Sequence, residues 1–396
     1  MKVEQIYLLM NNVTSEVIGK SNIVKEDLSN VVDLGKEIFD NASVDNYVKS
    51  LVNHIGKVIF VNRPYSGNIP SMLMDSWEFG SVLEKISADI PNATENDSWN
   101  LTDGKTYSQD VFYKPSVSTK FFNSKVTFEV PMSFTELQVK ESFSSVNQLN
   151  GFVSMIYNAV DKSMAIKIDS LVMRTINSMI ANTVNSEIAN TVNNGIVNGE
   201  TLANHRGTKA VNLLKYYNDK FGTELTVDKA LTTPEFIRYA SFVISVYKDR
   251  LSKISTLFNV GGKERFTPSD MLNIVMLSDF KNSASVYLES DTYHNELVAL
   301  PNCESVPYWQ GSGKTYSFAD VSKIDVAIPN GTTTKDVSVT GVLAIMYDRD
   351  SMGVCNSDRR ITTNYNAKAE FYNNYYKFDA SYFNDLNENF VVFYIA

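Results

Sequence analysis

Cysteine and histidine are scarce in this chain of 396 residues. It contains two cysteines, Cys303 and Cys355, and three histidines, His54, His205 and His294. The cysteines lie far apart in the sequence, so we expect two free thiols in a reducing compartment rather than a disulfide scaffold. None of the histidines has a cysteine or a carboxylate at the spacing of a metal-binding pair. We therefore expect no metal site and no cofactor.

Long apolar runs and blocks of basic residues are also missing. No stretch of about 18 apolar residues occurs, which excludes a membrane span, and residues 1–19 lack the pattern of a signal peptide. The formal net charge is −9, and the arginines are scattered. This balance argues against a surface built mainly to grip nucleic acid. We expect a soluble intracellular product with no membrane partner.

No catalytic motif stands out either. Residues 311–315 read Gly-Ser-Gly-Lys-Thr, which resembles the end of a phosphate-binding loop, but Tyr308 stands where the full motif needs its first glycine. A strand-like run follows in place of the long helix whose N-terminus would hold a phosphate. We interpret 311–315 as a flexible turn. The sequence predicts no catalytic and no cofactor-binding residues, so an enzyme is not expected.

The most informative feature that is present is a single long amphipathic helix, predicted for residues 147–194. Apolar residues recur along one face at steps of three and four. At about 1.5 Å per residue, roughly 40 residues give a rod of roughly 60 Å, which is typical of a scaffold element. The residues that we expect to face the core from this helix are Val153, Val160, Met164 and Leu171.

Strand-like and helical segments on both sides of this helix predict an α+β fold with two or three subdomains. Residues 125–131 alternate between apolar and polar, as in a half-buried strand. We expect the helix to pack on a sheet that includes Val126, Phe128 and residues 342–345. A compact unit begins near residue 233, with a helix that starts at Pro234. Further strands are predicted at 272–277, 323–328, 337–347 and 390–395.

Two segments are expected to lack a partner within their own part of the chain. Residues 1–52 contain too few apolar residues to fold alone, so they must lie on the rest of the chain or on a neighbour. The turn-dense segment 62–70 is followed by an apolar cluster and then by polar, turn-rich residues 97–115. The cluster fits either a packed loop or a projecting hairpin that covers another subunit. Its members are Met72, Leu73, Met74, Trp77 and Phe79.

In this order of elements the chain resembles the major capsid proteins of tailed bacteriophages, the family with the HK-ninety-seven-type fold. Within that family it is most similar to the capsid protein of small Bacillus podoviruses. The resemblance covers roughly residues 45–396. It is carried by short strings, among them Leu-Val-Asn-His-Ile-Gly-Lys-Val-Ile at 51–59, Lys-Pro-Ser-Val-Ser-Thr-Lys-Phe-Phe at 114–122, Phe-Val-Ser-Met-Ile-Tyr-Asn-Ala at 152–159, Met-Tyr-Asp-Arg-Asp-Ser-Met-Gly at 346–353 and Phe-Tyr-Asn-Asn-Tyr-Tyr at 371–376.

The resemblance implies both an architecture and a function. It implies an N-terminal arm (1–52), an extended loop (53–113), a peripheral domain with the long spine helix (114–233), an inserted axial domain (234–334) and a return to the peripheral domain (335–396). The implied function is self-assembly into hexamers and pentamers of an icosahedral or prolate head around double-stranded DNA. The implied partners are a scaffolding protein, the portal and, nonspecifically at the inner face, the packaged DNA. Assembly would take place in the bacterial cytoplasm.

Two other classes stay open from the sequence. One is another structural phage protein, such as a tail or sheath component, and the other is a two-domain α/β enzyme without a recognisable motif. Some capsid relatives crosslink a loop lysine to the next subunit. Between residues 62 and 99 this chain offers only Lys85, so we expect no crosslink.

Overall fold

The computed structural model describes most of the chain in two compact units. The described residues are 3–19, 24–41, 46–51, 69–74, 83–88, 93, 95–107, 110–114, 116–189, 199–289, 303–310, 317–330 and 332–396. Unit 1 comprises Met1–Gly80, Ser124–Val172 and Val354–Ser381, and unit 2 comprises Ser81–Asn123, Met173–Gly353 and Tyr382–Ala396. The glycine-rich turn predicted at 311–315 lies outside the described residues.

Unit 1 is built on a four-stranded sheet in the order β1-β11-β12-β4. The strands are β1 (Leu73–Met74), β11 (Met352–Asn366), β12 (Phe371–Asn384) and β4 (Lys125–Thr135). Strands β4 and β12 are antiparallel, and the ring centroids of Phe128 and Phe378 lie 5.1 Å apart across them. Exposed and more buried residues alternate along β4, as the predicted strand requires.

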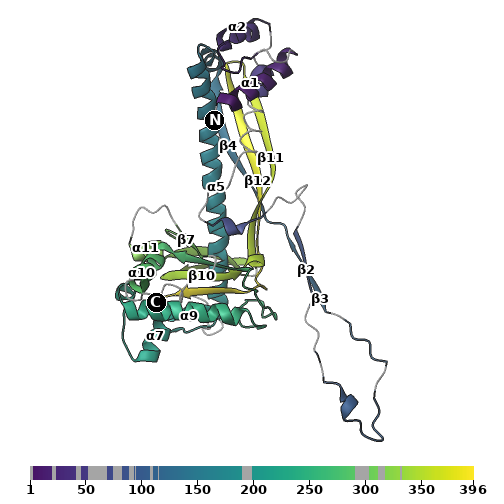
Figure 1. Cartoon of the computed structure of the whole chain (residues 1–396), viewed down its shortest axis with the longest axis vertical. Helices are drawn as coiled ribbons and strands as arrows, with labels where there is room; N and C mark the ends of the chain where they lie inside the picture. The colour runs from purple at the N-terminus through teal and green to yellow at the C-terminus, as the bar shows by residue number, and fades with distance from the viewer. Residues whose placement is uncertain are drawn as a thin grey trace. The chain divides into compact units, whose positions relative to one another are not determined.

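The predicted long helix is confirmed as α5 (Val146–Ala189), which has 44 residues. Its residues up to Val172 belong to unit 1, where it runs beside β4 and β12 (Figure 1). Phe152 of the helix packs edge-on against Phe134 of β4, with centroids 5.4 Å apart. All four predicted core residues of this helix are at most 2% exposed, namely Val153, Val160, Met164 and Leu171.

One part of that packing prediction is wrong. Val126 and Phe128 lie in β4, in the four-stranded sheet, whereas residues 342–345 lie in a different, five-stranded sheet of unit 2. The apolar runs of both sheets look alike in sequence, and nothing local tells which strands pair. The single expected sheet is therefore two.

The N-terminal segment packs on its own unit. It forms α1 (Val3–Ile18), which the sequence analysis missed, α2 (Val31–Asn41) and a helical turn at 46–51. Tyr47 is fully buried and packs edge-on against Phe143, next to α4 (Glu136–Ser142), at 5.7 Å between centroids. Gly35 of α2 comes so close that a Cβ there would lie 2.8 Å from the Cβ of Phe143. This close approach needs a glycine.

Unit 2 is built on a five-stranded sheet in the order β5-β13-β10-β6-β7. Its strands are β5 (Ala210–Asn212), β13 (Phe390–Tyr394), β10 (Val342–Asp348), β6 (Leu272–Leu277) and β7 (Cys303–Val306). Helices α7 (Leu213–Phe221), α9 (Pro234–Leu251) and α10 (Ser278–Glu289) share one apolar core with this sheet. Every residue of β10 is buried, as expected of a central strand.

The five-stranded sheet takes strands from both sides of the boundaries expected at 234 and 334, and these boundaries stay a prediction. β5 precedes the first boundary, and β10 and β13 follow the second, yet all three are hydrogen-bonded into the sheet that contains β6. The strand predicted at 337–347 is also two strands, β9 (Thr333–Val339) and β10, separated at Gly341. Gly341 has a φ of +76°, and a Cβ there would clash with the carbonyl oxygen of Ile395.

A separate hairpin of unit 2 is formed by β2 (Leu83–Ala88) and β3 (Val117–Phe122), which pair antiparallel from Leu83 with Phe122 to Ala88 with Val117. We call the described residues 95–107 and 110–114 between these strands the hairpin tip. The remaining described elements are η1 (Pro70–Met72), η3 (Asp97–Trp99), α6 (Gly199–Asn204), α8 (Val227–Ala230), α11 (Phe318–Val321), β8 (Ile324–Asn330) and η5 (Arg349–Ser351). No helix in the described part of the chain combines the length and hydrophobicity that a membrane crossing needs.

Candidate functional site

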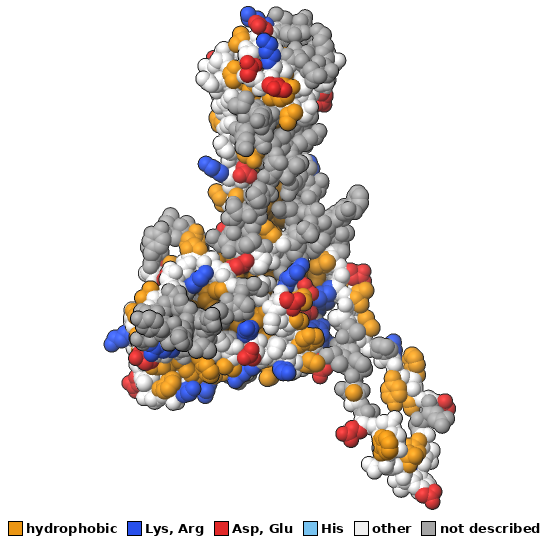
Figure 2. All heavy atoms as spheres, in the orientation of Figure 1, with side chains coloured by type: hydrophobic (Ala, Val, Ile, Leu, Met, Phe, Trp, Pro, Cys, Tyr) orange, Lys and Arg blue, Asp and Glu red, His pale blue; other side chains and the backbone are white. Residues whose placement is uncertain are grey.

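The hairpin tip exposes large apolar side chains. Trp99 is 95% exposed, Phe112 86% and Tyr113 84%, and Leu101 and Val111 are exposed as well. Figure 2 shows apolar side chains gathered along the segment beyond β2 and β3. Single exposed apolar residues are ordinary, but several on one projecting segment indicate a contact surface. From the sequence this segment was expected to be polar and turn-rich, although it contains Trp99 and Phe112.

The apolar cluster singled out in the sequence has a different environment. Met72 is 1% exposed, and Leu73 is half-buried. The backbones of Leu73 and Met74 pair with β11 within unit 1. Met72 is therefore buried within its own chain, which fits the packed loop, one of the two alternatives. Trp77 and Phe79 lie outside the described residues, so an intersubunit role of this cluster stays a prediction.

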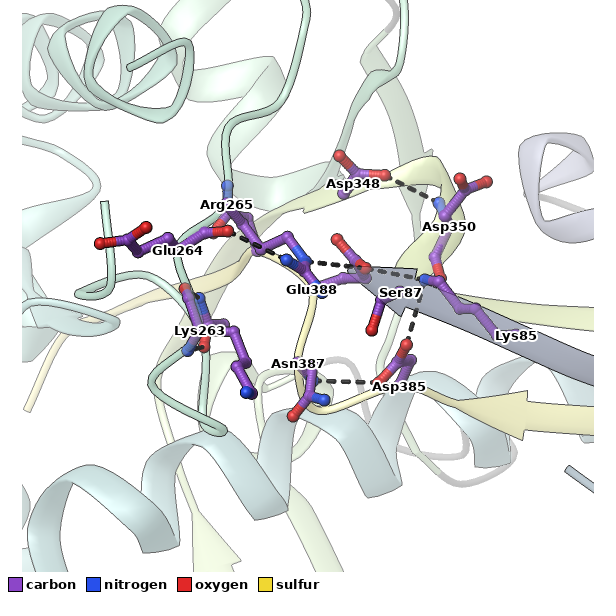
Figure 3. A network of polar contacts seen from close by, with 12 residues as sticks. Lys85, Ser87, Lys263, Glu264, Arg265, Asp348, Asp350, Asp385, Asn387 and Glu388 are labelled. Atoms are coloured by element: carbon purple, nitrogen blue, oxygen red, sulfur yellow. Dashed lines mark hydrogen bonds and ion pairs between the residues drawn. The ribbon is translucent and has the colours of Figure 1, made fainter. Parts of the chain in front are cut away.

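At its base the hairpin is held by a network of ion pairs (Figure 3). The Nζ of Lys85 on β2 lies 3.0 Å from Asp385 Oδ2 and 2.8 Å from Glu388 Oε1, and it donates to the carbonyl oxygen of Asp350 at 3.3 Å. The Nζ of Lys120 on β3 lies 2.9 Å from Asp385 Oδ1. Lys85 and Lys120 face each other across the hairpin. Two like charges at such positions repel each other, and the carboxylate that both contact removes this repulsion.

The turn that carries these carboxylates is itself fixed by backbone hydrogen bonds. The N–H of Asp385 donates to Ser351 O at 2.6 Å, and the N–H of Gly261 donates to Leu386 O at 2.8 Å. A side-chain bond adds to these, since the N–H of Asn387 donates to Asp385 Oδ1 at 3.1 Å. The hairpin is therefore tied to a part of unit 2 that has little freedom to move.

A second ring of contacts surrounds the ion pairs. Arg265 Nε lies 3.2 Å from Glu388 Oε1. The buried Asp348 accepts a hydrogen bond from Thr267 Oγ1 at 2.7 Å and another from the N–H of Asp350 at 2.9 Å. Burial raises the pKa of Asp348, and the nearby charges of Glu388 and Asp350 raise it as well. The two hydrogen bonds lower this pKa, but the net shift is upward.

The ion pairs keep their charges in spite of burial. Burial alone would lower the pKa of Lys85, but its hydrogen bonds to Glu388 and Asp385 and their charges raise that pKa. Burial alone would raise the pKa of Asp385, but the hydrogen bond from Lys120 and the charge of Lys85 lower it. Lys85 and Asp385 thus stabilise each other's charged forms.

The charged side chains at the base of the hairpin contact one another. The described residues contain no cluster of histidine, cysteine and carboxylate side chains that could hold a metal ion. Lys85, the one candidate for a crosslink, has its ammonium group engaged in the ion pairs. The features that stand out are an anchored hairpin and an uncovered apolar tip.

The fold is that of the capsid proteins of tailed bacteriophages. A chain in the capsid structure of Staphylococcus phage Andhra matches with a TM-score of 0.50 and 9% identity, over 84% of this chain and 86% of that chain. A chain in the structure of the head fiber and inner core protein gp22 of native bacteriophage P68 matches at 0.48 and 10% identity, over 85% and 86%. A comparison with curated protein sequences finds no match.

The family of this chain is identified by a match to its sequence. The model of the family described as Phi29-like phage major capsid protein matches residues 9–394, so the chain belongs to that family. It is a structural protein of the phage capsid, it assembles with copies of itself in the virion shell, and it is not an enzyme. Membership favours this function over the tail, sheath and enzyme alternatives.

Proposed function

We propose that this chain forms the hexamers and pentamers of an icosahedral or prolate head around double-stranded DNA, and that its hairpin grips a neighbouring copy. The observation that carries the proposal is the contrast within one hairpin. Its base is anchored by buried ion pairs through Asp385, while its tip presents Trp99, Phe112 and Tyr113 almost fully exposed. A hairpin that is anchored at its base and apolar at its tip is suited to bind a neighbouring copy.

The energetics favour such a contact. An isolated two-stranded hairpin is marginally stable in water, and the ion pairs at the base supply the missing support. Burying a large apolar side chain gains about 1.5–3 kcal/mol, so three aromatic residues at every copy make a substantial contribution. Tryptophan and tyrosine also bring a polar group that can hydrogen-bond across an interface.

We assign each part of the chain to one part of the capsid subunit. Unit 1, with the sheet beside α5, acts as the peripheral domain with the spine helix. The five-stranded sheet of unit 2 carries the axial domain, whose residues 234–334 would lie around the hexamer or pentamer axis. The hairpin forms the outer part of the extended loop, and residues 1–52 form the arm. Support comes from the order of these parts along the chain, which is the order that the resemblance to tailed-phage capsid proteins implies.

Further partners follow from the assembly of a head. A scaffolding protein, the portal and the packaged DNA are the partners that we propose, with assembly in the cytoplasm of the bacterial host. The net charge of −9 suits a shell that must not hold its DNA tightly, because tight nonspecific binding needs many Lys and Arg contacts to phosphates.

The proposal is tested with the double variant Trp99→Ser/Phe112→Ser. We expect a folded protein, by circular dichroism, that yields no closed shells by negative-stain microscopy and sedimentation. Val286→Ser is the matched control, because Val286 is 63% exposed on α10, and it should assemble normally. Closed shells at the wild-type yield from the double variant would exclude the hairpin from the contact between copies.

A further inference from the structure

Unit 2 carries a cluster of exposed aromatic side chains on α7 and α9. Phe221 is 53% exposed and Phe242 57%, with the half-buried Tyr239 between them. Tyr239 lies 5.5 Å from Phe221 in an edge-on arrangement and 6.4 Å from Phe242, measured between ring centroids. We call these three residues, together with Lys220, the aromatic patch. Two exposed rings that both contact a half-buried third exceed the scattered apolar residues of an ordinary surface.

Lys220 gives the aromatic patch a positive charge. Its Nζ lies 4.8 Å from the ring centroid of Tyr239, 5.5 Å from that of Phe221 and 5.8 Å from that of Phe242. Within the described part of the chain no carboxylate forms an ion pair with Lys220, and its neighbour Asp219 pairs with Lys215 instead, at 2.7 Å. The ammonium group is held over the rings and can still accept a carboxylate.

The aromatic patch is held in place from below. Tyr217, only 8% exposed, lies 4.9 Å from Phe221, 5.8 Å from Tyr239 and 5.6 Å from the fully buried Phe236. Helix α7 ends directly after Phe221, at Gly222, which adopts the left-handed conformation. Because the rings are already fixed, binding costs little side-chain entropy, which is a property of interface hot spots.

We propose that the aromatic patch receives the hairpin tip of a second copy of this chain. This inference rests on the proposed role of the hairpin and adds the surface that it contacts. Both surfaces are aromatic. In the proposed contact, the most exposed aromatic side chains of the tip meet the exposed rings of the patch. Within one copy the tip residues remain 84–95% exposed, so a copy's own patch does not cover them.

The two surfaces also match in charge. Residues 95–114 contain four acidic residues and two lysines, which gives a net charge of 2 − 4 = −2. They are Glu95, Asp97, Asp103, Asp110, Lys105 and Lys114. The patch presents the positive charge of Lys220. Opposite charges at the rim of an apolar contact set its register and exclude wrong partners.

Photocrosslinking tests the contact directly. Phe242 is replaced by p-benzoylphenylalanine, which keeps an aromatic ring at the position, and unlabelled and nitrogen-15-labelled copies are assembled together. We expect mass spectrometry to find crosslinks to residues 95–114 of a different copy. The same probe at Val286, which is also exposed, should give none. Crosslinks from Phe242 to another segment or to another protein would overturn the proposal.

A charge exchange tests the energetics. Lys220→Glu should reduce the yield of closed shells by about tenfold at low salt, because it places like charges together. Adding Asp103→Lys or Asp110→Lys in the same chain should restore at least half of the lost yield. Wild-type yield from Lys220→Glu, or a loss that neither lysine variant reverses, would overturn this receiving surface. The two proposals can fail separately. If Trp99→Ser/Phe112→Ser fails to assemble while the Lys220 variants overturn the receiving surface, the hairpin still contacts another copy, but at a different surface.

Discussion

The base and the tip of one hairpin differ in almost every property that stabilises a folded chain. At the base, Lys85 and Lys120 share Asp385, whose side chain is 2% exposed. At the tip, Trp99 and Phe112 are almost fully exposed. The base is thus complete within one copy, and the tip is not. Folding and assembly therefore depend on separate parts of this hairpin, so a variant can disturb one and spare the other.

The largest effect on folding is expected from Asp385→Ala. It leaves two facing lysines, 24% and 38% exposed at their side chains, without the carboxylate that both contact. Breaking a largely buried pair costs about 3–5 kcal/mol, and partial exposure of the lysines reduces this to about 2–4 kcal/mol. Chemical denaturation measures the loss, and hydrogen exchange should show faster exchange in β2 and β3.

A matched control for this variant is Asp325→Ala. Asp325 pairs with Lys323 at 2.8 Å, but both side chains are exposed, at 51% and 44%. An exposed pair contributes little to stability, because solvent screens it. Equal losses from the two variants would mean that the network at the base has no special importance for the hairpin.

A smaller effect is expected from acid. The pKa of Asp385 is lowered in the folded state, because its bonds to Lys120 and Lys85 outweigh burial, which raises it. Its contribution is therefore present above the unfolded pKa of about 3.9 and is lost as the pH falls through the lower folded value. The raised pKa of Asp348 has the opposite sign: protonation favours the folded state, so Asp348 stabilises as the pH falls.

The measurement compares hydrogen exchange of β2 and β3 at pH 7 and at pH 3, after correction for the intrinsic rate. We expect protection of these strands to fall in acid while that of β10 is retained. Asp385→Asn should have low protection at both values, with a much weaker dependence on pH. Unchanged protection of the wild-type hairpin at pH 3 would contradict an anchor made of ion pairs.

Features with a local signature could be predicted from the sequence. The apolar spacing of α5 is uninterrupted over its length, and β6 is a compact apolar run, so both elements were expected close to their observed bounds. The pairing of β10 with β6 and β13 could not be predicted. It depends on which of several similar apolar runs meet, and that is a property of the whole fold.

Less of the candidate site than of the fold could be predicted from the sequence. Lys85 and Asp385 are 300 positions apart (385 − 85), and a lysine or an aspartate among so many others carries no sign of its partner. At the tip a signal was present, because Trp99 and Phe112 stand in a segment that is rich in polar residues. Their exposure follows only from the length of the hairpin, which sets them beyond the strands β2 and β3.

The smallest effect on folding is expected from the tip itself. Trp99→Ser should change the free energy of unfolding of the unassembled protein by no more than about 0.5 kcal/mol, as for other exposed positions, since Trp99 is 95% exposed and loses little contact. Assembly, by contrast, should be weakened. The protein concentration at which shells form should rise, because burial of this ring against a neighbour is lost. Denaturation of the unassembled protein and light scattering over a concentration series measure the two quantities. A large loss of folding stability would show that Trp99 packs on its own copy, and an unchanged assembly threshold would place it outside the contact.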